Sequence, residues 1–145
     1  MRKSVFFDSW AWIGITDRKD PYHKTAKLFY EDYLMQGGIP VTTDYVLDEV
    51  FTVLRKRLNT DLLIKFGENI FLAVKMQKIQ LESIDRKRME KEWKLMKKYR
   101  DKSDIFFTDF TSFALMSELG ITEVFSGDEH FEKVNMGFKR VGCGV

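Results

Sequence analysis

The chain has 145 residues, of which 44% are hydrophobic and 32% are charged, and its formal net charge is +2. These values exclude an intrinsically disordered chain and predict one globular domain, spanning residues 1–145, that buries a hydrophobic core. No apolar run reaches the roughly 20 residues of a membrane-spanning helix, and the run that Asp8 interrupts is too short for a signal peptide. The single cysteine, Cys143, excludes an intramolecular disulfide and is typical of a reducing cytoplasm. We therefore expect a cytoplasmic protein with no membrane association.

Short apolar runs alternate with segments of helical periodicity in the first half of the chain. The helices carry start or stop signals of the usual kinds, such as an acidic N-cap, a proline in the first turn or terminating glycines. The predicted elements are a strand over 4–7, a helix from Asp20-Pro21 to Gly37-Gly38, a strand over 39–42, a helix from Asp44 to the break at Asn59-Thr60, and a helix with apolar residues from Leu63 to Val74.

The same alternation continues in the second half. Asp85 predicts the start of a helix whose inner face we expect to carry Met89, Trp93 and Met96. Strands that alternate with helices predict an α/β fold with a parallel sheet. The other predicted elements are a strand over 79–82, a helix capped by Thr108 and ended by Gly120, a strand over 123–126, a helical turn over 128–135 and a strand over 138–141.

Positive charge is concentrated in the segment 85–102, which holds nine Lys and Arg residues against four acids. A local excess of this kind attracts phosphate groups. The simpler interpretation is a solvated helix face, and the sequence leaves both interpretations open.

Acidic residues follow two of the predicted strands, at the end of the sheet where open parallel α/β folds bind ligands. Asp8 comes directly after the first strand, and Asp128 follows the strand over 123–126 after one glycine. Either acid alone is explained equally well as a helix cap or a turn residue. Two such acids in one small sheet indicate a candidate site.

A third acid, Glu49, lies inside a predicted helix next to another acid, Asp48. At about 100° per residue, Glu49 falls at the edge of the apolar arc, whereas Asp48 falls opposite its centre, in solvent. A carboxylate that borders the buried face needs a partner, because an unpaired buried charge is costly. That partner is either a nearby base, Lys56 or Arg57, or a metal ion shared with other acids.

Asp109 is the fourth candidate, in the first turn of a predicted helix. The helix dipole there favours an ionised carboxylate, and simple capping is the competing explanation. The two histidines, His23 and His130, lack the spacing of a zinc pair, and no phosphate-binding glycine loop or serine-nucleophile motif is present. Carboxylate ligands suit Mg²⁺ or Mn²⁺, and carboxylates around such ions are typical of phosphodiester chemistry.

Four segments resemble the motifs of PIN domains, and they carry all four candidate acids. Residues 5–12 resemble the opening strand with its Asp and hydroxyl residue, and residues 47–55 resemble the helical Glu motif. Residues 108–114 and 125–131 resemble the third and fourth motifs. The resemblance spans essentially the whole chain in order, and the short length is similar to that of VapC-like toxins of toxin–antitoxin pairs.

This resemblance implies a three-layer α/β/α fold with a central parallel sheet, endoribonuclease activity that depends on Mg²⁺ or Mn²⁺, and a homodimer. For VapC-like members it also implies a VapB-like antitoxin partner. It makes Asp8 and Asp109 the most direct metal ligands, with Glu49 and Asp128 completing the catalytic, metal-binding set. Auxiliary roles, such as orienting RNA or water, fall to three residues near the motifs: Ser9, Asp104 and Thr108.

Phe106 and Gly127 depart from the family pattern without removing a carboxylate, so they affect the expected fit of the substrate more than catalysis. Two alternatives stay open: a housekeeping RNA-processing or structure-specific nuclease, and a PIN-like nucleic-acid-binding or regulatory protein that no longer cleaves. Three aromatic residues near the motifs are candidates for stacking on RNA bases, although core packing is their simpler role: Trp10, Trp12 and Tyr45.

Overall fold

The computed structural model describes residues 3–142, so Cys143 and the expectation attached to it lie outside the described residues. Its centre is a five-stranded parallel sheet with the strand order β3-β2-β1-β4-β5. Each strand matches a predicted strand to within two residues. The strands are β1 (Val5–Phe7), β2 (Val41–Thr43), β3 (Gln80–Glu82), β4 (Glu123–Phe125) and β5 (Lys139–Val141).

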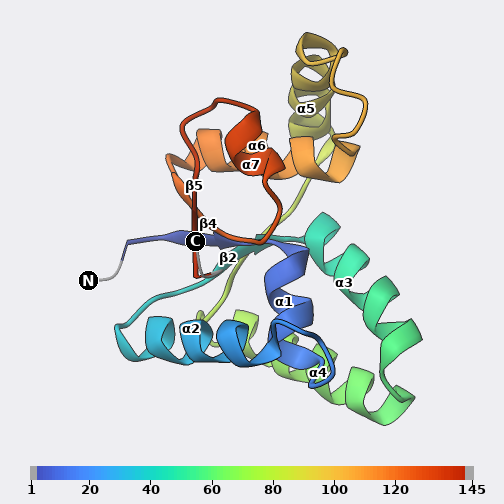
Figure 1. Cartoon of the computed structure of the whole chain (residues 1–145), viewed down its shortest axis with the longest axis vertical. Coiled ribbons are helices and arrows are strands. Elements are labelled where there is room, and N and C mark those ends of the chain that lie inside the picture. Colours follow the sequence, from blue (N-terminus) through green and yellow to red (C-terminus); the bar gives the residue numbers. More distant parts are fainter. Residues whose placement is uncertain (1–2, 143–145) are drawn as a thin grey trace.

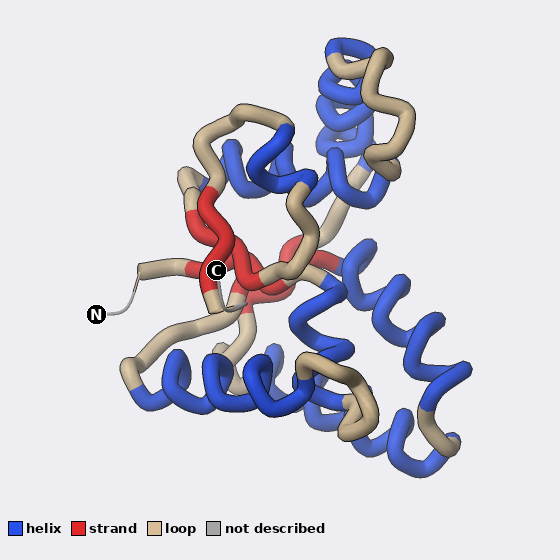
Figure 2. Tube along the Cα trace, in the orientation of Figure 1, coloured by secondary structure: helices blue, strands red, loops and turns tan. Residues whose placement is uncertain are grey.

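Helices cover both faces of the sheet. They are α1 (Ser9–Thr16), α2 (His23–Met35), α3 (Asp44–Arg57), α4 (Thr60–Lys75), α5 (Arg86–Lys98), α6 (Phe107–Leu119) and α7 (His130–Lys133). Figure 1 shows α5, α6 and α7 on one side and α1, α2 and α4 on the other, and Figure 2 shows the strands between these two groups. The expected three-layer α/β/α fold is therefore confirmed. No helix within residues 3–142 is both long and apolar enough to cross a membrane.

The strand order reverses at β1, in the middle of the sheet. The chain moves outward from β1 to β2 and β3, and then places β4 and β5 on the other side of β1. Phe6 therefore pairs with Val41 on one side and with Val124 on the other. Open α/β sheets bind ligands at such a reversal, beyond the carboxyl ends of the strands. Asp8 and Asp128 both lie at this end, after β1 and β4.

Aromatic side chains pack around β1 and fix its position. All three residues of β1 are fully buried. The ring centroid of Phe7 lies 5.1 Å from that of Trp12 and 5.1 Å from that of Phe125, so the central strand, α1 and β4 share one core. The strand end that carries Asp8 is therefore held by tightly packed apolar side chains, which pack with little free volume in protein interiors.

Helix α1 has no counterpart among the predicted elements, which leave residues 9–16 unassigned. Its sequence lacks an amphipathic pattern because apolar residues occur all round the helix, and Ala11, Trp12 and Gly14 are buried. A Cβ at Gly14 would lie 3.2 Å from the Cβ of Ala26, so the glycine allows α1 and α2 to approach closely. The helix is defined by tertiary packing on two sides, and periodicity alone does not reveal it.

Three helix starts differ from the predictions. Thr43, not Asp44, caps α3, because its side chain accepts a hydrogen bond from the Val46 amide at 3.0 Å. Asp20 accepts a hydrogen bond from the amide of Tyr22 in a turn, so α2 begins only at His23. Helix α6 begins at Phe107, which places Thr108 inside the first turn and not at the cap. By contrast, Asp85 caps α5 and Gly120 ends α6 in the left-handed conformation, as predicted.

The expected inner face of α5 is confirmed for Met96 and wrong for Met89 and Trp93. Trp93 is 54% exposed and Met89 is 40% exposed, whereas Glu92 is buried to 1% exposure. The helix carries two apolar stripes, and the one that packs on the core includes Leu95 and Met96. Glu92 is buried because it shares that stripe at helical spacing, while Met89 and Trp93 lie on a different side of the helix.

Glu92 is an unusual residue for this position, since neither of its carboxylate oxygens has a hydrogen-bond partner among the described residues. Burial raises the pKa of Glu92 to about 8, although the nearby positive charge of Arg88 acts in the opposite direction. The folded chain therefore retains a proton on Glu92 at neutral pH that the unfolded chain releases, and its stability falls as the pH rises from the ordinary Glu value towards 8.

Replacing Glu92 with Met is expected to increase the free energy of unfolding at pH 8 by about 1–3 kcal/mol, because an unpaired buried carboxylate is exchanged for an apolar side chain. Urea denaturation at pH 6 and pH 8 measures this gain, which is expected to be larger at the higher pH. The exposed Glu90 provides the control, and Glu90→Met is expected to change stability by less than about 0.5 kcal/mol. A loss of stability in Glu92→Met would contradict the prediction.

Candidate active site

Asp8 stands at the centre of the candidate site, directly after β1. Its side chain is 6% exposed, and its Oδ2 accepts a hydrogen bond of 2.8 Å from the hydroxyl of Ser126. Burial raises the pKa of Asp8 to about 7, and the negative charges of Asp109 and Glu49 raise it further against the effect of the Ser126 hydrogen bond. Asp8 is thus a buried carboxylate in a negative environment, which is a typical property of functional sites.

Asp109 lies in the first turn of α6, about a hundred residues after Asp8 in the sequence. Its Oδ2 accepts a hydrogen bond of 3.3 Å from the amide of Phe106, so the capping role considered from the sequence is present. Burial raises the pKa of Asp109 to about 6, and the charges of Asp128 and Glu49 also raise it. Capping alone does not explain Asp109, because a residue needed only as a helix cap would not have to lie among other acids, which raise its pKa.

Glu49 lies on α3 and is half-buried, whereas its neighbour Asp48 is exposed, which confirms the helical geometry read from the sequence. The hydroxyl of Ser9 donates a hydrogen bond of 3.0 Å to Oε1 of Glu49. One of the basic partners considered for Glu49 is engaged elsewhere, since Arg57 pairs with Asp17 and Asp20. Glu49 is therefore turned towards the end of β1 and not towards Arg57.

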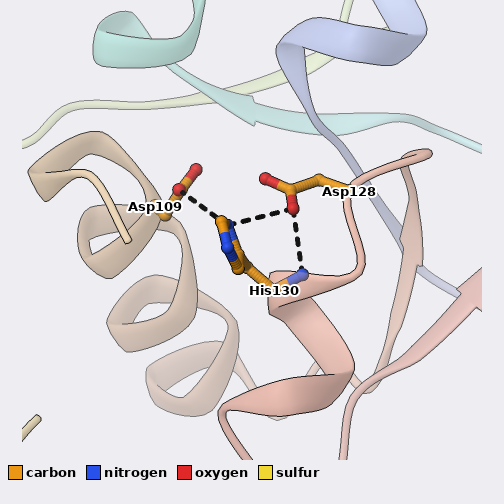
Figure 3. A group of neighbouring side chains, drawn as sticks. All are labelled: Asp109, Asp128 and His130. Atoms are coloured by element: carbon orange, nitrogen blue, oxygen red, sulfur yellow. Dashed lines mark hydrogen bonds and ion pairs between the residues drawn. The ribbon is translucent and has the colours of Figure 1, made fainter. Parts of the chain in front are cut away.

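Asp128 follows β4 and lies beside His130, as Figure 3 shows. The amide of Asp128 donates a hydrogen bond of 3.0 Å to the Ser126 hydroxyl, and its Oδ1 accepts one of 2.9 Å from the His130 amide. The His130 Nδ1 lies 3.1 Å from Asp128 Oδ1 and 3.8 Å from Asp109 Oδ2. The imidazole of His130 thus lies between the carboxylate of Asp128, which follows β4, and that of Asp109, in the first turn of α6.

The other ring nitrogen of His130 contacts Asp104, in the loop before α6. The distance from Nε2 to Asp104 Oδ2 is 3.0 Å, and this hydrogen bond lowers the pKa of Asp104. Asp104 is largely exposed, so it meets the site through the imidazole and not directly. A carboxylate in this position holds the orientation of a histidine ring.

The donor set fits a divalent cation. One ligand atom each from Asp109, Asp128 and His130 lies within 4.8 Å of the others, so a single ion can contact all three. Asp8 and Glu49 add negative charge next to this group, as the raised pKa of Asp109 and that of Asp8 show. Oxygen-rich sites of this kind suit Mg²⁺ or Mn²⁺, whereas an imidazole ligand is more usual for later transition metals.

Two residues of this arrangement were not recognised as site residues in the sequence. Ser126 is fully buried, and its single hydroxyl joins Asp8 to the amide of Asp128. His130 was set aside because it lacks a zinc-type partner along the chain. The available signal was its spacing of two residues from Asp128, within the fourth motif. Ser126 gave no signal of its own, because a serine at the end of a strand is common.

The aromatic residues near the motifs have mostly structural roles. Trp12 is 1% exposed and donates a hydrogen bond to Thr42, so it belongs to the core. Trp10 packs against the backbone of Gly127, where a Cβ would lie 2.4 Å from the indole nitrogen. Gly127 therefore leaves the space that Trp10 fills, which explains its departure from the family pattern.

Thr108, one of the auxiliary candidates, accepts a hydrogen bond of 2.6 Å from the Thr111 hydroxyl through its backbone carbonyl oxygen.

Comparison with known proteins adds a family and a fold. The family model described as PIN domain matches residues 5–136. The proteins named 23S rRNA-specific endonuclease VapC20 from two Mycobacterium tuberculosis strains, CDC 1551 and H37Rv, are 24% identical over 128 residues, covering 88% of this chain and 91% of theirs. The crystal structure of Mycobacterium tuberculosis VapC20, titled a Sarcin-Ricin loop cleaving toxin, superposes with a TM-score of 0.77 at 23% identity, covering 93% of this chain and 96% of that one.

Proposed function

The chain belongs to the PIN domain family, and from this premise we propose that it is a single-domain, divalent-metal-dependent endoribonuclease that acts as the toxin of a toxin–antitoxin pair. The observation that carries the proposal is the clustering of Asp8, Glu49, Asp109 and Asp128, in which burial and mutual repulsion raise the pKa of Asp8 and that of Asp109. Such an arrangement is costly in the absence of a counter-ion, and it is suited to a cation and a phosphate.

Asp109, Asp128 and His130 are the residues we assign to hold Mg²⁺ or Mn²⁺, with Asp8 and Glu49 completing the negative environment. When bound, a divalent cation supplies stabilisation of phosphate charge and lowers the pKa of a water molecule. The Ser126 hydroxyl holds one oxygen of Asp8 in place, and the Ser9 hydroxyl does the same for Glu49. Carboxylates held in this way are able to orient a water molecule and accept its proton.

RNA is the proposed substrate because the similar Mycobacterium tuberculosis proteins are named as 23S rRNA-specific endonucleases. A VapB-like antitoxin and a homodimeric assembly, which the resemblance to VapC-like toxins implies, complete the proposal together with the cytoplasmic location that the single cysteine favours. A small antitoxin-like reading frame next to the gene would support the toxin role. An isolated gene would favour the housekeeping RNA-processing alternative.

Purified protein with Mn²⁺ is expected to cleave single-stranded or loop regions of structured RNA while leaving duplex DNA largely intact, because RNA recognition exploits unstacked bases. Gel analysis of total RNA, matched single-stranded DNA and duplex DNA measures this preference. Asp8→Asn is the control, and it is expected to abolish cleavage. Equal rates on DNA and RNA would contradict the substrate. Cleavage that survives Asp8→Asn would place the activity outside this site, and a wild-type protein that binds RNA without cleaving it would favour the non-cleaving alternative.

A further inference from the structure

Apolar side chains line an exposed cleft between α5 and the start of α6. The cleft has a volume of about 460 Å³ and is lined by Met89, Glu90, Trp93, Lys94, Lys97 and Phe107. The ring centroids of Trp93 and Phe107 lie 6.3 Å apart at an interplanar angle of 57°, and Trp93 is 54% exposed. Burial in the core therefore does not explain the position of Trp93, and the cleft leaves an aromatic face open to a ligand.

The cleft is adjacent to the carboxylate site along the chain. Phe106, which precedes the cleft residue Phe107, is 75% exposed, and its amide donates a hydrogen bond to Asp109. An exposed phenylalanine thus neighbours the cleft residue Phe107 in the chain and contacts a candidate metal ligand, Asp109, through its backbone amide. Phe107 and Asp109 both lie in the first turn of α6, about 3 Å apart along the helix axis, so a polymer bound with one phosphate at the carboxylates has a short span to cover to the cleft.

The charges around the cleft are suited to a polyanion. Helix α5 has the sequence RKRMEKEWKLMKK, and Lys94 and Lys97 lie at the cleft itself. A second copy of the chain seated here would place two lysine-rich helices against each other, and like charges in contact oppose association. A chain of phosphates meets the same lysines with complementary charge. The combination of open aromatic faces and lysines is typical of surfaces that bind single-stranded nucleic acid.

We propose that Trp93 and Phe107, together with Phe106, form a stacking platform for unpaired RNA bases next to the cleavage site, with Lys94 and Lys97 contacting the phosphates. This proposal rests on the proposed ribonuclease function and names the surface that contacts the substrate. It assigns a use to the second apolar stripe of α5, with Met89 and Trp93, which the core leaves exposed. It also gives a role to Phe106, the second departure from the family pattern.

The test is a binding titration of a fluorescein-labelled single-stranded oligoribonucleotide with the full-length protein in EDTA, where metal-dependent cleavage does not take place. Trp93→Ala and Phe106→Ala are each expected to weaken binding roughly 5- to 150-fold, the range found for the loss of one base-stacking contact. Lys97→Ala is expected to make the dependence of affinity on salt concentration less steep, by about one phosphate contact. Phe71→Ala removes an exposed aromatic residue from α4, on the other side of the sheet, and serves as the matched control.

A second RNA of the same length with abasic riboses separates stacking from charge. Wild type and Trp93→Ala are expected to bind this RNA equally weakly, because its phosphates remain and its bases are gone. Unchanged affinity of Trp93→Ala and Phe106→Ala for the normal RNA would overturn the proposal, as would a defect of the same size with abasic RNA. Loss of a dimer in sedimentation of Trp93→Ala, with RNA affinity unchanged, would show that the cleft binds a second copy.

The binding and cleavage assays distinguish a failure of the stacking platform from a failure of the proposed ribonuclease function. Base-dependent binding that Trp93→Ala weakens, in a wild-type protein without cleavage activity, would retain the platform and reject the ribonuclease. Cleavage that needs Asp8, with binding that does not respond to Trp93→Ala, would give the opposite result.

Discussion

Glu49→Gln is expected to lower the rate of RNA cleavage by about 100-fold or more, the range of losses seen when a positioned acid or base is removed. The substitution keeps the shape of the side chain and its contact with Ser9, but it removes the negative charge next to Asp8 and Asp109. The measurement is the initial rate of cleavage of a labelled RNA at saturating Mn²⁺.

The neighbouring acid gives this prediction a matched control. Asp48 is exposed on the same helix, so Asp48→Asn removes the same charge one residue away and is expected to keep the rate within about twofold of wild type. Equal losses in the two variants would reject the placement of Glu49 in the site. A thermal melt of each variant separates an unfolded protein from an inactive one.

Metal-free protein is expected to lose stability as the pH rises from about 4 to 7, and Mn²⁺ is expected to restore it. The pKa of Asp8 is raised to about 7 and that of Asp109 to about 6. The folded chain therefore holds protons that the unfolded chain has already released in this range, and the free energy of unfolding falls with increasing pH. A bound cation neutralises the same carboxylates without protons, so its stabilising effect is expected to be largest above pH 7.

The stabilisation by Mn²⁺ follows from mass action. At a concentration 100-fold above its dissociation constant, an ion that binds only the folded state adds about 2.7 kcal/mol to the free energy of unfolding. Scanning calorimetry between pH 5 and 8, with EDTA or with Mn²⁺, measures both effects. Asp8→Asn is expected to flatten the pH dependence of stability and to reduce the gain from Mn²⁺. Both variants are measured in a Glu92→Met background, which removes the carboxyl of raised pKa that lies outside the site. A melting temperature that Mn²⁺ does not move in the wild type would argue against a metal site.

The sequence predicted the elements whose signals are local. Alternating strands and helices gave the parallel sheet, and the period of α3 separated Glu49 from Asp48. The missed elements depend on long-range packing. Helix α1 is buried on several sides, so its apolar residues show no single face. In α5 two apolar stripes competed, and the sequence does not show which one packs on the core.

The candidate site was predictable only in part, for a related reason. Asp8 and Asp128 follow strands, Asp109 lies in the first turn of a helix and Glu49 borders the apolar face of another, so patterns along the chain identify all four acids. His130 and Ser126 act through contacts between segments that are far apart in sequence, such as the hydrogen bond from Ser126 to Asp8. Aromatic residues near the motifs were identified in the sequence as candidates for stacking on RNA bases, but one of them, Trp12, is buried. The exposed tryptophan is Trp93, which lies far from the motifs in the sequence.

The buried hydroxyl of Ser126 has a consequence for how fast a cation can be captured. Because it bonds both the carboxylate of Asp8 and the backbone of Asp128, the segments that leave β1 and β4 are fastened to each other before any ion arrives. The conformational entropy of arranging these two acids is therefore lost when the chain folds and not when the ion binds. Capture is then governed by the release of water from the ion, and the capture rate is expected to follow the water-exchange rate of the metal supplied. A Ser126→Ala variant, in which the two segments are free to move separately, is expected to lose that correlation and capture every ion more slowly.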